Sequence, residues 1–221
     1  MISDSRPPSD IDDRGEGSGS PDGSATKRRS VRGCLFEVVE TLVLTVAIFL
    51  GIQFFVAQPY KVEGGSMEMT LLPDEYVLID KLTPRWALYA RGDVVVLDPP
   101  SEASMTRGVP FIKRVIGLPL DHVELKDGTV YVNGTALTEP YVYSEGGRSQ
   151  DTDPSPGGPT EWLVPEGHLL VMGDHRRDSS DSRAFGPVEI SHIIGRAWLR
   201  YWPIDTFGTL QSPTYLETNS P

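Results

Sequence analysis

A long apolar run lies near the N-terminus, from Thr41 to Tyr60, and it contains no charged residue. A run of about 20 residues matches the length that a helix needs to cross about 30 Å of hydrocarbon. A buried core helix is one alternative, although the run is apolar all round and long for such a helix. A cleaved signal peptide is another alternative. Such a peptide has small residues at positions −1 and −3 before its cleavage site, and the possible sites here, after Ala57 and after Gly65, do not have both. We therefore expect a retained transmembrane anchor over residues 34–60.

After this run the pattern changes to short stretches rich in Val, Ile, Tyr and Trp, each bounded by turn residues. This pattern predicts β-strands in six regions, which are Tyr76–Leu82, Gly92–Asp98, Pro110–Leu118, Asp121–Leu137, Gly167–Asp174 and Ile193–Pro203. Two hairpins are indicated by Asp127-Gly128 and Asn133-Gly134, because both central residues of a type I′ turn need a positive φ. No long amphipathic helix intervenes, so we expect a mostly β body without βαβ units.

Two segments show neither a long apolar run nor the strand pattern. Residues 1–33 are rich in Ser, Gly, Asp, Arg and Pro and cannot bury a core, which predicts a disordered tail. Residues 144–160, SEGGRSQDTDPSPGGPT, predict an exposed, mobile loop. The chain therefore divides into the tail, the anchor, an extracytoplasmic domain over residues 61–205 and a C-terminal tail over residues 206–221.

Charge gives this arrangement an orientation. Four basic residues lie between Lys27 and Arg32 before the apolar run, whereas only Lys61 follows it closely. The positive-inside rule then places the N-terminus in the cytoplasm and everything after Tyr60 outside. We expect a single-pass protein of the cell membrane, in contact with the lipid bilayer.

Composition argues against several other classes of site. The net charge of −11 leaves no basic stripe to neutralise nucleic acid. The single cysteine, Cys34, rules out an internal disulfide and is more simply a packed residue. The histidines form no HExxH motif and no close pair, so a zinc site has little to be built from; they are His122, His168, His175 and His192.

A serine directly after the apolar run has an open setting. Ser66 follows Gly64 and Gly65 in the sequence KVEGGSMEMTLLPDE, and glycines let a substrate backbone come close. A turn or cap is the simpler interpretation of such a serine. The functional one is a nucleophile, which needs a base because a hydroxyl is weakly nucleophilic at its own pKa.

A lysine in the sequence FIKRVIG is the candidate base. On a strand, Lys113 shares one face with Phe111 and Val115, and this apolar setting lowers the pKa of a lysine toward neutrality. The amine can then accept the serine proton. The alternative is a lysine that extends its ammonium to water, and His175 is a competing base. The residues alone leave these alternatives open.

The segment GDHRRDSSDSRAFG, Gly173 to Gly186, concentrates acids and arginines among serines. It lacks the Asp-x-Asp-x-Asp-Gly spacing of a calcium loop and contains three arginines. Turns held by Asp–Arg pairs fit this composition better.

Taken together, the blocks resemble type I signal peptidase (leader peptidase), a family of membrane-anchored Ser/Lys endopeptidases that remove signal peptides. Behind the apolar run stand GGSMEMTLLP, RGDVVVLDPP, FIKRVIGLPLD and VPEGHLLVMGDHRRDSSDSRAFG, and the likeness covers about Glu37 to Pro203. The resemblance implies an antiparallel β body with a smaller β extension. It also implies preproteins with signal peptides as partners, and neither a metal nor a cofactor.

The resemblance assigns roles to individual residues. Ser66 would be the nucleophile and Lys113 the general base, and the Ser179 hydroxyl would help to orient the lysine. Asp181 and Arg183 would form a supporting ion pair. Substrate-binding positions, which line shallow pockets for small side chains, would be Val62, Gly64, Met67, Leu71, Phe111 and Ile112.

Four positions depart from the family's pattern. The family often has Pro where Met69 stands, Gly where Leu120 stands and Asn where His175 stands. Some members carry Ser where Gly64 stands, and its hydroxyl helps to bind the oxyanion, so that donor is absent here. The Ser66 N–H would remain.

The expected reaction is therefore cleavage of signal peptides from exported preproteins at the outer face of the membrane, through an acyl-enzyme. Two alternatives are a self-cleaving Ser/Lys peptidase of related fold and a non-catalytic β module tethered to the membrane.

Overall fold

The computed structural model describes residues 31–51, 57–82, 88–100, 108–213 and 215. Contacts divide the chain into two units, Met1–Leu44 and Thr45–Pro221. Most of the predicted tail, residues 1–30, and the end of the C-terminal tail, residues 216–221, lie outside the described residues.

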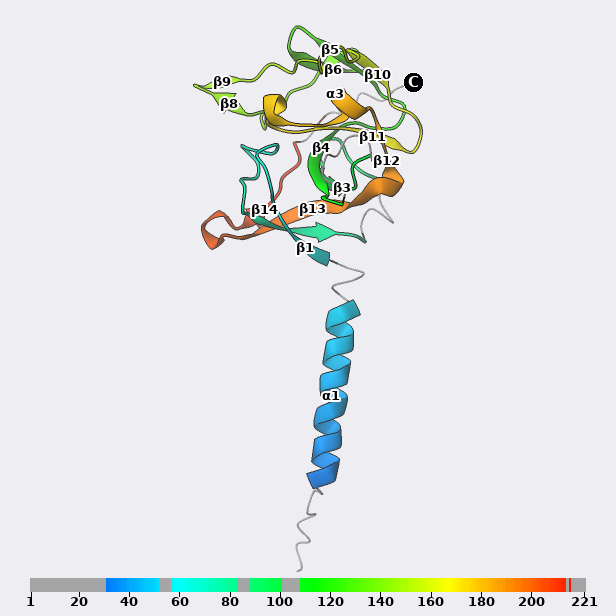
Figure 1. The fold of residues 1–221 in the computed structure, drawn as a ribbon, viewed down its shortest axis with the longest axis vertical. Helices are drawn as coiled ribbons and strands as arrows, with labels where there is room; N and C mark the ends of the chain where they lie inside the picture. Colours follow the sequence, from blue (N-terminus) through cyan, green and yellow to red (C-terminus); the bar gives the residue numbers. More distant parts are fainter. Residues whose placement is uncertain (1–30, 52–56, 83–87, 101–107, 214, 216–221) are drawn as a thin grey trace, which may run out of the picture. The chain divides into compact units, whose positions relative to one another are not determined.

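Helix α1 spans Val31–Gly51 (Figure 1). The successive side chains of Leu42, Val43 and Leu44 are all exposed. Since successive helical residues lie about 100° apart, given 3.6 residues per turn, apolar groups project from several sides of α1. Within the described part of the chain, no helix combines the length and the apolarity that crossing a membrane requires.

The structure corrects the expected C-terminal end of the anchor. Helix α1 ends at Gly51, and Ala57–Lys61 forms strand β1, whereas the helix was expected to continue to Tyr60. Strand β1 pairs antiparallel with β2 (Tyr76–Asp80), so its backbone polar groups bond to the sheet. Pro59 fits there because β1 lies at the edge of the sheet, where a missing N–H is tolerated. Residues 52–56 lie outside the described residues.

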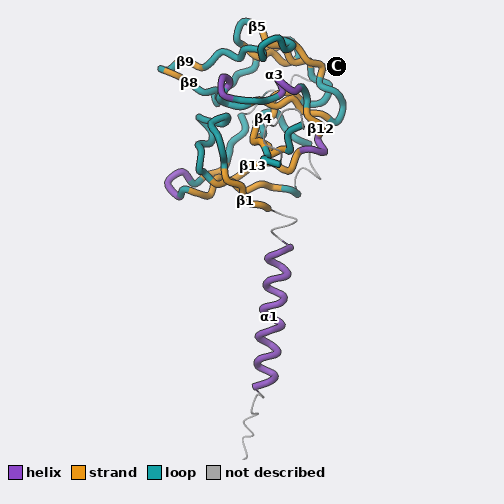
Figure 2. Tube along the Cα trace, in the orientation of Figure 1, coloured by secondary structure: helices purple, strands orange, loops and turns teal. Residues whose placement is uncertain are grey.

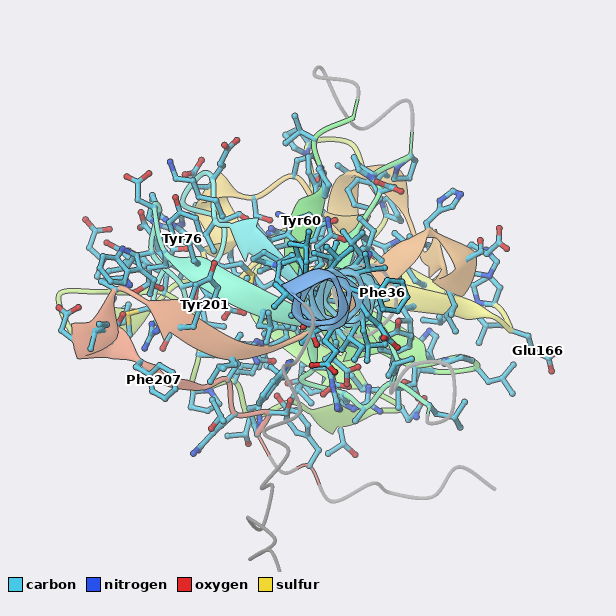
Figure 3. All side chains as sticks on the ribbon, turned by 90° about the horizontal axis from the view of Figure 1, so that it is seen from below. Phe36, Tyr60, Tyr76, Glu166, Tyr201 and Phe207 are labelled. Carbon is cyan, nitrogen blue, oxygen red and sulfur yellow. The ribbon has the colours of Figure 1, made fainter. Side chains whose placement is uncertain are left out.

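The body is mostly antiparallel β, as the strand pattern predicts, and loops join the strands (Figure 2). Its main sheet has the order β1-β2-β13-β3-β4-β11-β12, and β14 pairs with β13. The remaining strands of this sheet are β3 (Val94–Leu97), β4 (Phe111–Gly117), β11 (His168–Met172), β12 (Val188–Glu189), β13 (Ile193–Trp202) and β14 (Gly208–Thr209). On β2 and β13, Tyr76 and Tyr201 lie side by side, with ring centroids 6.0 Å apart (Figure 3).

A smaller sheet extends the body at the end away from β1 and β13 (Figure 1). Its order is β10-β5-β6-β7, and its strands are β5 (His122–Lys126), β6 (Thr129–Val132), β7 (Thr135–Ala136) and β10 (Glu161–Leu163). Both predicted hairpins are confirmed, with φ of 52° at Asp127 and 51° at Asn133. The two turns divide the region Asp121–Leu137 into three short strands.

Residues 144–160, which composition predicts to be an exposed loop, contain some regular structure. Strands β8 (Ser144–Glu145) and β9 (Arg148–Ser149) form a short hairpin. Thr152 is buried, and its N–H donates to the Gly128 carbonyl over 2.8 Å. Part of this segment therefore packs against the smaller sheet.

Helical structure in the body is limited to single turns among the described residues. These are η2 (Arg176–Asp178), α3 (Ser182–Phe185), η3 (Ile190–His192) and η4 (Ile204–Thr206).

Strand β3 is buried on both faces and joins two parts of the core. Val94 and Val96 pack in a cluster that includes Met67 and Leu71 from the segment after β1. Val95, one residue along and therefore on the other face, packs in a second cluster with residues of β4 and β11. The first cluster fixes the chain directly after Ser66.

Candidate active site

Ser66 lies in a loop whose two ends are joined by hydrogen bonds and whose apolar side chains pack into the core. The Val62 N–H donates to the Glu75 carbonyl over 2.8 Å, and the Asp74 N–H donates to the Val62 carbonyl over 3.0 Å. Met67, directly after the serine, is completely buried. The serine itself is half-buried, so its side chain stays accessible although the main chain around it is packed.

Lys113 comes from β4, opposite Val95 of β3. Its side chain does not extend to water, because the residue is only 4% exposed. The Nζ atom donates to Ser66 Oγ over 2.8 Å and lies 5.0 Å from the centroid of the Phe111 ring. Two residues 47 positions apart in the chain are thus brought into direct contact.

The setting of Lys113 disfavours the charged form of its amine. Burial lowers the pKa of the Lys113 amine to about 8, although the carboxylates of Asp181 and Asp174 act in the opposite direction. Burial outweighs them because the charged form loses its hydration. The amine can therefore give up its proton near neutral pH, which an exposed lysine does not do.

The predicted supporting residues form one connected group. Arg183 donates to Asp181 through Nε, over 2.9 Å, and through Nη2, over 2.8 Å, which makes the pair bidentate. The Ser179 hydroxyl donates to the same carboxylate over 2.7 Å. Burial of Asp181 favours its neutral form, but the hydrogen bonds from Arg183 and Gly173 hold the pKa of its carboxyl below the usual value. This buried anion carries the largest charge effect on Lys113.

The loop that carries this group also touches the main chain of the serine. The His175 N–H donates to the Ser66 carbonyl over 3.0 Å. A Cβ atom on Gly173 would lie 2.6 Å from that carbonyl oxygen and would also overlap Ser179. A side chain at position 173 would therefore push the two loops apart.

The sequence analysis assigned no role to an arginine and an aspartate that lie beside the site. Arg114, next to Lys113 but on the other face of β4, pairs with Asp174 through two hydrogen bonds of 2.8 and 2.7 Å. Both side chains are almost completely buried, and Thr70 bonds to each of them. An arginine in an apolar strand was the available signal, since a buried guanidinium needs a carboxylate partner.

A cleft of about 580 Å³ opens beside Ser66 and Lys113. Four of the six predicted substrate-binding residues line it, namely Val62, Gly64, Phe111 and Ile112. Met67 and Leu71 differ from the expectation: both are completely buried in the core cluster with Val62, so they support the cleft from within.

Three of the departures from the family's pattern lie at positive φ, in the region that disfavours L side chains. Gly64 has a φ of 78°, so a serine there would be strained in this conformation. Leu120 has a φ of 72°, which accounts for the suitability of Gly at that position. Met69 has a φ of 85°, which Pro cannot adopt because its ring fixes φ near −65°. The turn after the serine therefore differs from one that contains Pro.

Among the described residues, no group of three His, Cys, Asp or Glu side chains could hold a metal ion.

His175, the competing base, faces Glu68. Its Nδ1 atom lies 3.2 Å from Glu68 Oε2.

A family model and two curated relatives agree with one another. A family described as "Signal peptidase, peptidase S26" matches residues 35–202. A probable signal peptidase I-2 from Synechocystis is 36% identical over 176 residues, which are 79% of this chain and 76% of that protein. The signal peptidase I of Bacillus licheniformis is 33% identical over 183 residues, covering 81% and 95% of the two chains. A crystal structure of a signal peptidase I from Enterococcus faecalis is 30% identical and covers 50% of this chain and 97% of that one, with a TM-score of 0.41.

Proposed function

The chain belongs to the signal peptidase family, peptidase S26, and we propose that it removes signal peptides from exported preproteins at the outer face of the membrane. The observation that carries the proposal is the buried Lys113 amine, 2.8 Å from the Ser66 hydroxyl, at the edge of an open cleft. This pair supplies a nucleophile and a base without a metal.

In the first half of the reaction Ser66 Oγ attacks the carbonyl carbon of the scissile bond, and the neutral Lys113 amine takes the hydroxyl proton. The resulting ammonium then gives this proton to the nitrogen of the leaving chain, which departs with a free N-terminus. In the second half Lys113 takes a proton from water, which attacks the Ser66 ester. The signal peptide leaves with a new carboxylate, and the proton returns to Ser66.

The developing oxyanion needs hydrogen-bond donors. The Ser66 main-chain N–H is the donor that we propose, because Gly64 offers no side-chain hydroxyl. The loss of one such donor costs about 10²–10³ in rate in other serine enzymes, so this chain relies on its backbone at the step.

The substrate enters as an extended segment. Residues on both sides of the cleft, Lys61–Gly64 and Gly108–Ile112, present main chain with which a strand can pair. Val62, Phe111 and Ile112 give apolar walls close to Ser66, which suit the small side chains that precede a signal-peptide cleavage site.

Two further roles follow in the same proposal. Asp181, held by Arg183 and bonded to Ser179, fixes the loop beside Lys113 and sets the charge that the amine experiences. Ser179 orients the lysine, as the family resemblance implies.

Membrane attachment accounts for two groups of exposed apolar side chains. Large exposed apolar patches mark contact surfaces. One group runs along α1 and includes Leu42, Phe49 and Leu50. The other lies on β13 and the turn after it, with Trp202 and Phe207 among its members. Trp side chains favour the membrane–water interface. We propose that the segment starting at α1 anchors the protein and that the body works at the outer surface.

A labelled preprotein incubated with the purified full chain in detergent tests this function. Wild-type protein should release a mature product whose new N-terminus follows small residues at −1 and −3. The Ser66→Ala variant should leave the precursor intact, whereas EDTA should not affect the wild type. An uncut precursor with wild-type protein would indicate the non-catalytic alternative, and cleavage of only the chain itself would indicate the self-cleaving one. Activity that EDTA removes and zinc restores would also overturn the proposal.

A further inference from the structure

The turn after the nucleophile is held in an unusual conformation. The Thr70 N–H donates to the Met67 carbonyl over 3.0 Å, which closes a four-residue turn. Met69 occupies its third position with a φ of 85°, where glycine is strongly preferred. The Met69 side chain is 56% exposed, so packing of this side chain does not hold the turn. Contacts of neighbouring residues must do so.

Two side chains flank Met69, and both reach the same loop. Thr70 bonds to Asp174, while Glu68 Oε2 lies 3.2 Å from Nδ1 of the next residue, His175. The His175 main chain also bonds to the Ser66 carbonyl. Asp174 and His175 of one loop thus contact three alternate residues of the other loop. These residues are the nucleophile Ser66, Glu68 and Thr70.

The imidazole of His175 is fixed in place. Its ring stacks on Tyr143, with centroids 4.1 Å apart and planes inclined by 13°. The Tyr143 N–H in turn donates to the Asp174 carbonyl over 2.9 Å, so the stacking partner is tied to the same loop. Nδ1 is buried from solvent and makes no aligned hydrogen bond to any described residue, and the Glu68 carboxylate lies 3.2 Å from it.

The Glu68 carboxylate is also close to the main chain before the serine. A Cβ atom on Gly65 would lie 2.8 Å from Glu68 Oε1. The side chains of Glu68 and His175 are 30% and 17% exposed, so solvent screens their interaction only in part. The Glu68–His175 pair therefore lies close to the main chain both before and after Ser66.

We propose that Glu68 and His175 are positioning residues for this reaction: their contact holds the strained turn Met67–Thr70 and, through it, the main chain of Ser66. They act on the nucleophile through the backbone, whereas Lys113 acts on it directly. The inference rests on the proposed function. It concerns a position, His175, where the family often has Asn.

The test compares kcat and KM of wild-type protein and Glu68→Ala on a labelled preprotein. A nucleophile displaced by about 1 Å can lose about 10²-fold in rate, so we expect kcat to fall by about ten- to a hundredfold. KM should stay close to wild type, because Glu68 does not line the cleft. The matched control is Glu166→Ala, an exposed glutamate at the rim of the body (Figure 3), which should change neither constant.

Rescue separates positioning from a general structural role. Glycine removes the strain at position 69, so adding Met69→Gly to Glu68→Ala should restore much of the lost kcat. In a double-mutant cycle, Glu68→Ala with His175→Asn should cost little more than either change alone, since the two residues make one contact. Should Glu68→Ala fail to fold, Glu68→Gln takes its place, with a smaller loss and the same rescue expected.

Each result decides between the hypotheses. An active wild type whose kcat is unchanged by Glu68→Ala would overturn the positioning role and leave the peptidase function standing. A loss that Met69→Gly does not restore, or losses that simply add in the cycle, would also overturn it. An inactive wild type would instead count against the proposed function itself.

Discussion

Lys113 Nζ lies 2.8 Å from Ser66 Oγ, and the lysine that forms this contact is almost completely buried. A buried amine hydrogen-bonded to a hydroxyl at the edge of a cleft is poised to remove its proton once it is neutral. The charge on Lys113 therefore affects both the pH dependence of the activity and the stability of the fold.

Activity should rise with pH along a single acid limb. Burial lowers the pKa of Lys113 to about 8, and only the neutral amine can accept the serine proton. Below this pKa the amine is protonated and activity is lost; above it the rate reaches a plateau. The measurement is kcat/KM against pH for the purified enzyme, which reports the ionisation of the free enzyme. A profile that falls through this range as pH rises would contradict the assignment.

Replacing the lysine by Met should stabilise the fold at neutral pH while it abolishes activity. The pKa of Lys113 drops from 10.5 to about 8 on folding, so the folded state disfavours the charged amine by up to about 3 kcal/mol. This cost is fully present below about pH 8, where the amine is charged in both states, and it disappears as pH rises toward the unfolded value. Met fills a similar volume without the charge.

Thermal melts of wild type and Lys113→Met at several pH values measure this effect. The variant should melt at a higher temperature near neutral pH, and the gap should narrow as the solution becomes alkaline. A variant that is less stable at neutral pH would show that contacts of the ammonium outweigh its desolvation.

Topology gives an independent prediction. Four basic residues precede the apolar run and only Lys61 follows it closely, so we expect the body to lie outside. Protease added to the outer face of intact cells should digest the C-terminal body, detected with an antibody against residues 61–205. Digestion confined to the N-terminal tail would show the opposite orientation.

The sequence predicts the β body well because its signals are local. Alternation and turn residues mark most strands of the main sheet to within a few residues, and both Asx-Gly pairs form hairpins with positive φ at Asp127 and Asn133. The composition of residues 173–186 indicated Asp–Arg pairs in general, and the family resemblance implied the particular pair Asp181–Arg183.

The missed features depend on contacts between distant segments. Hydrophobicity alone does not show that the apolar run changes from helix to an edge strand at Ala57, because β1 is defined by its pairing with β2. Arg114 reaches Asp174 over 60 positions, and Glu68 meets His175 across two loops. Met67 looked like part of the pocket wall, but its direction into the core follows from the turn that closes after Ser66.

The central claim is that a neutral Lys113 amine is the base for Ser66. The Lys113→Arg variant tests it most directly, because arginine keeps the length and the charge but cannot give up its proton in a protein. After a thermal melt has shown that the variant is folded, its turnover of a labelled preprotein is measured beside wild type. The account predicts no detectable processing at any pH along the acid limb. Near wild-type turnover by a folded Lys113→Arg enzyme would mean that another group, with His175 the first candidate, activates Ser66.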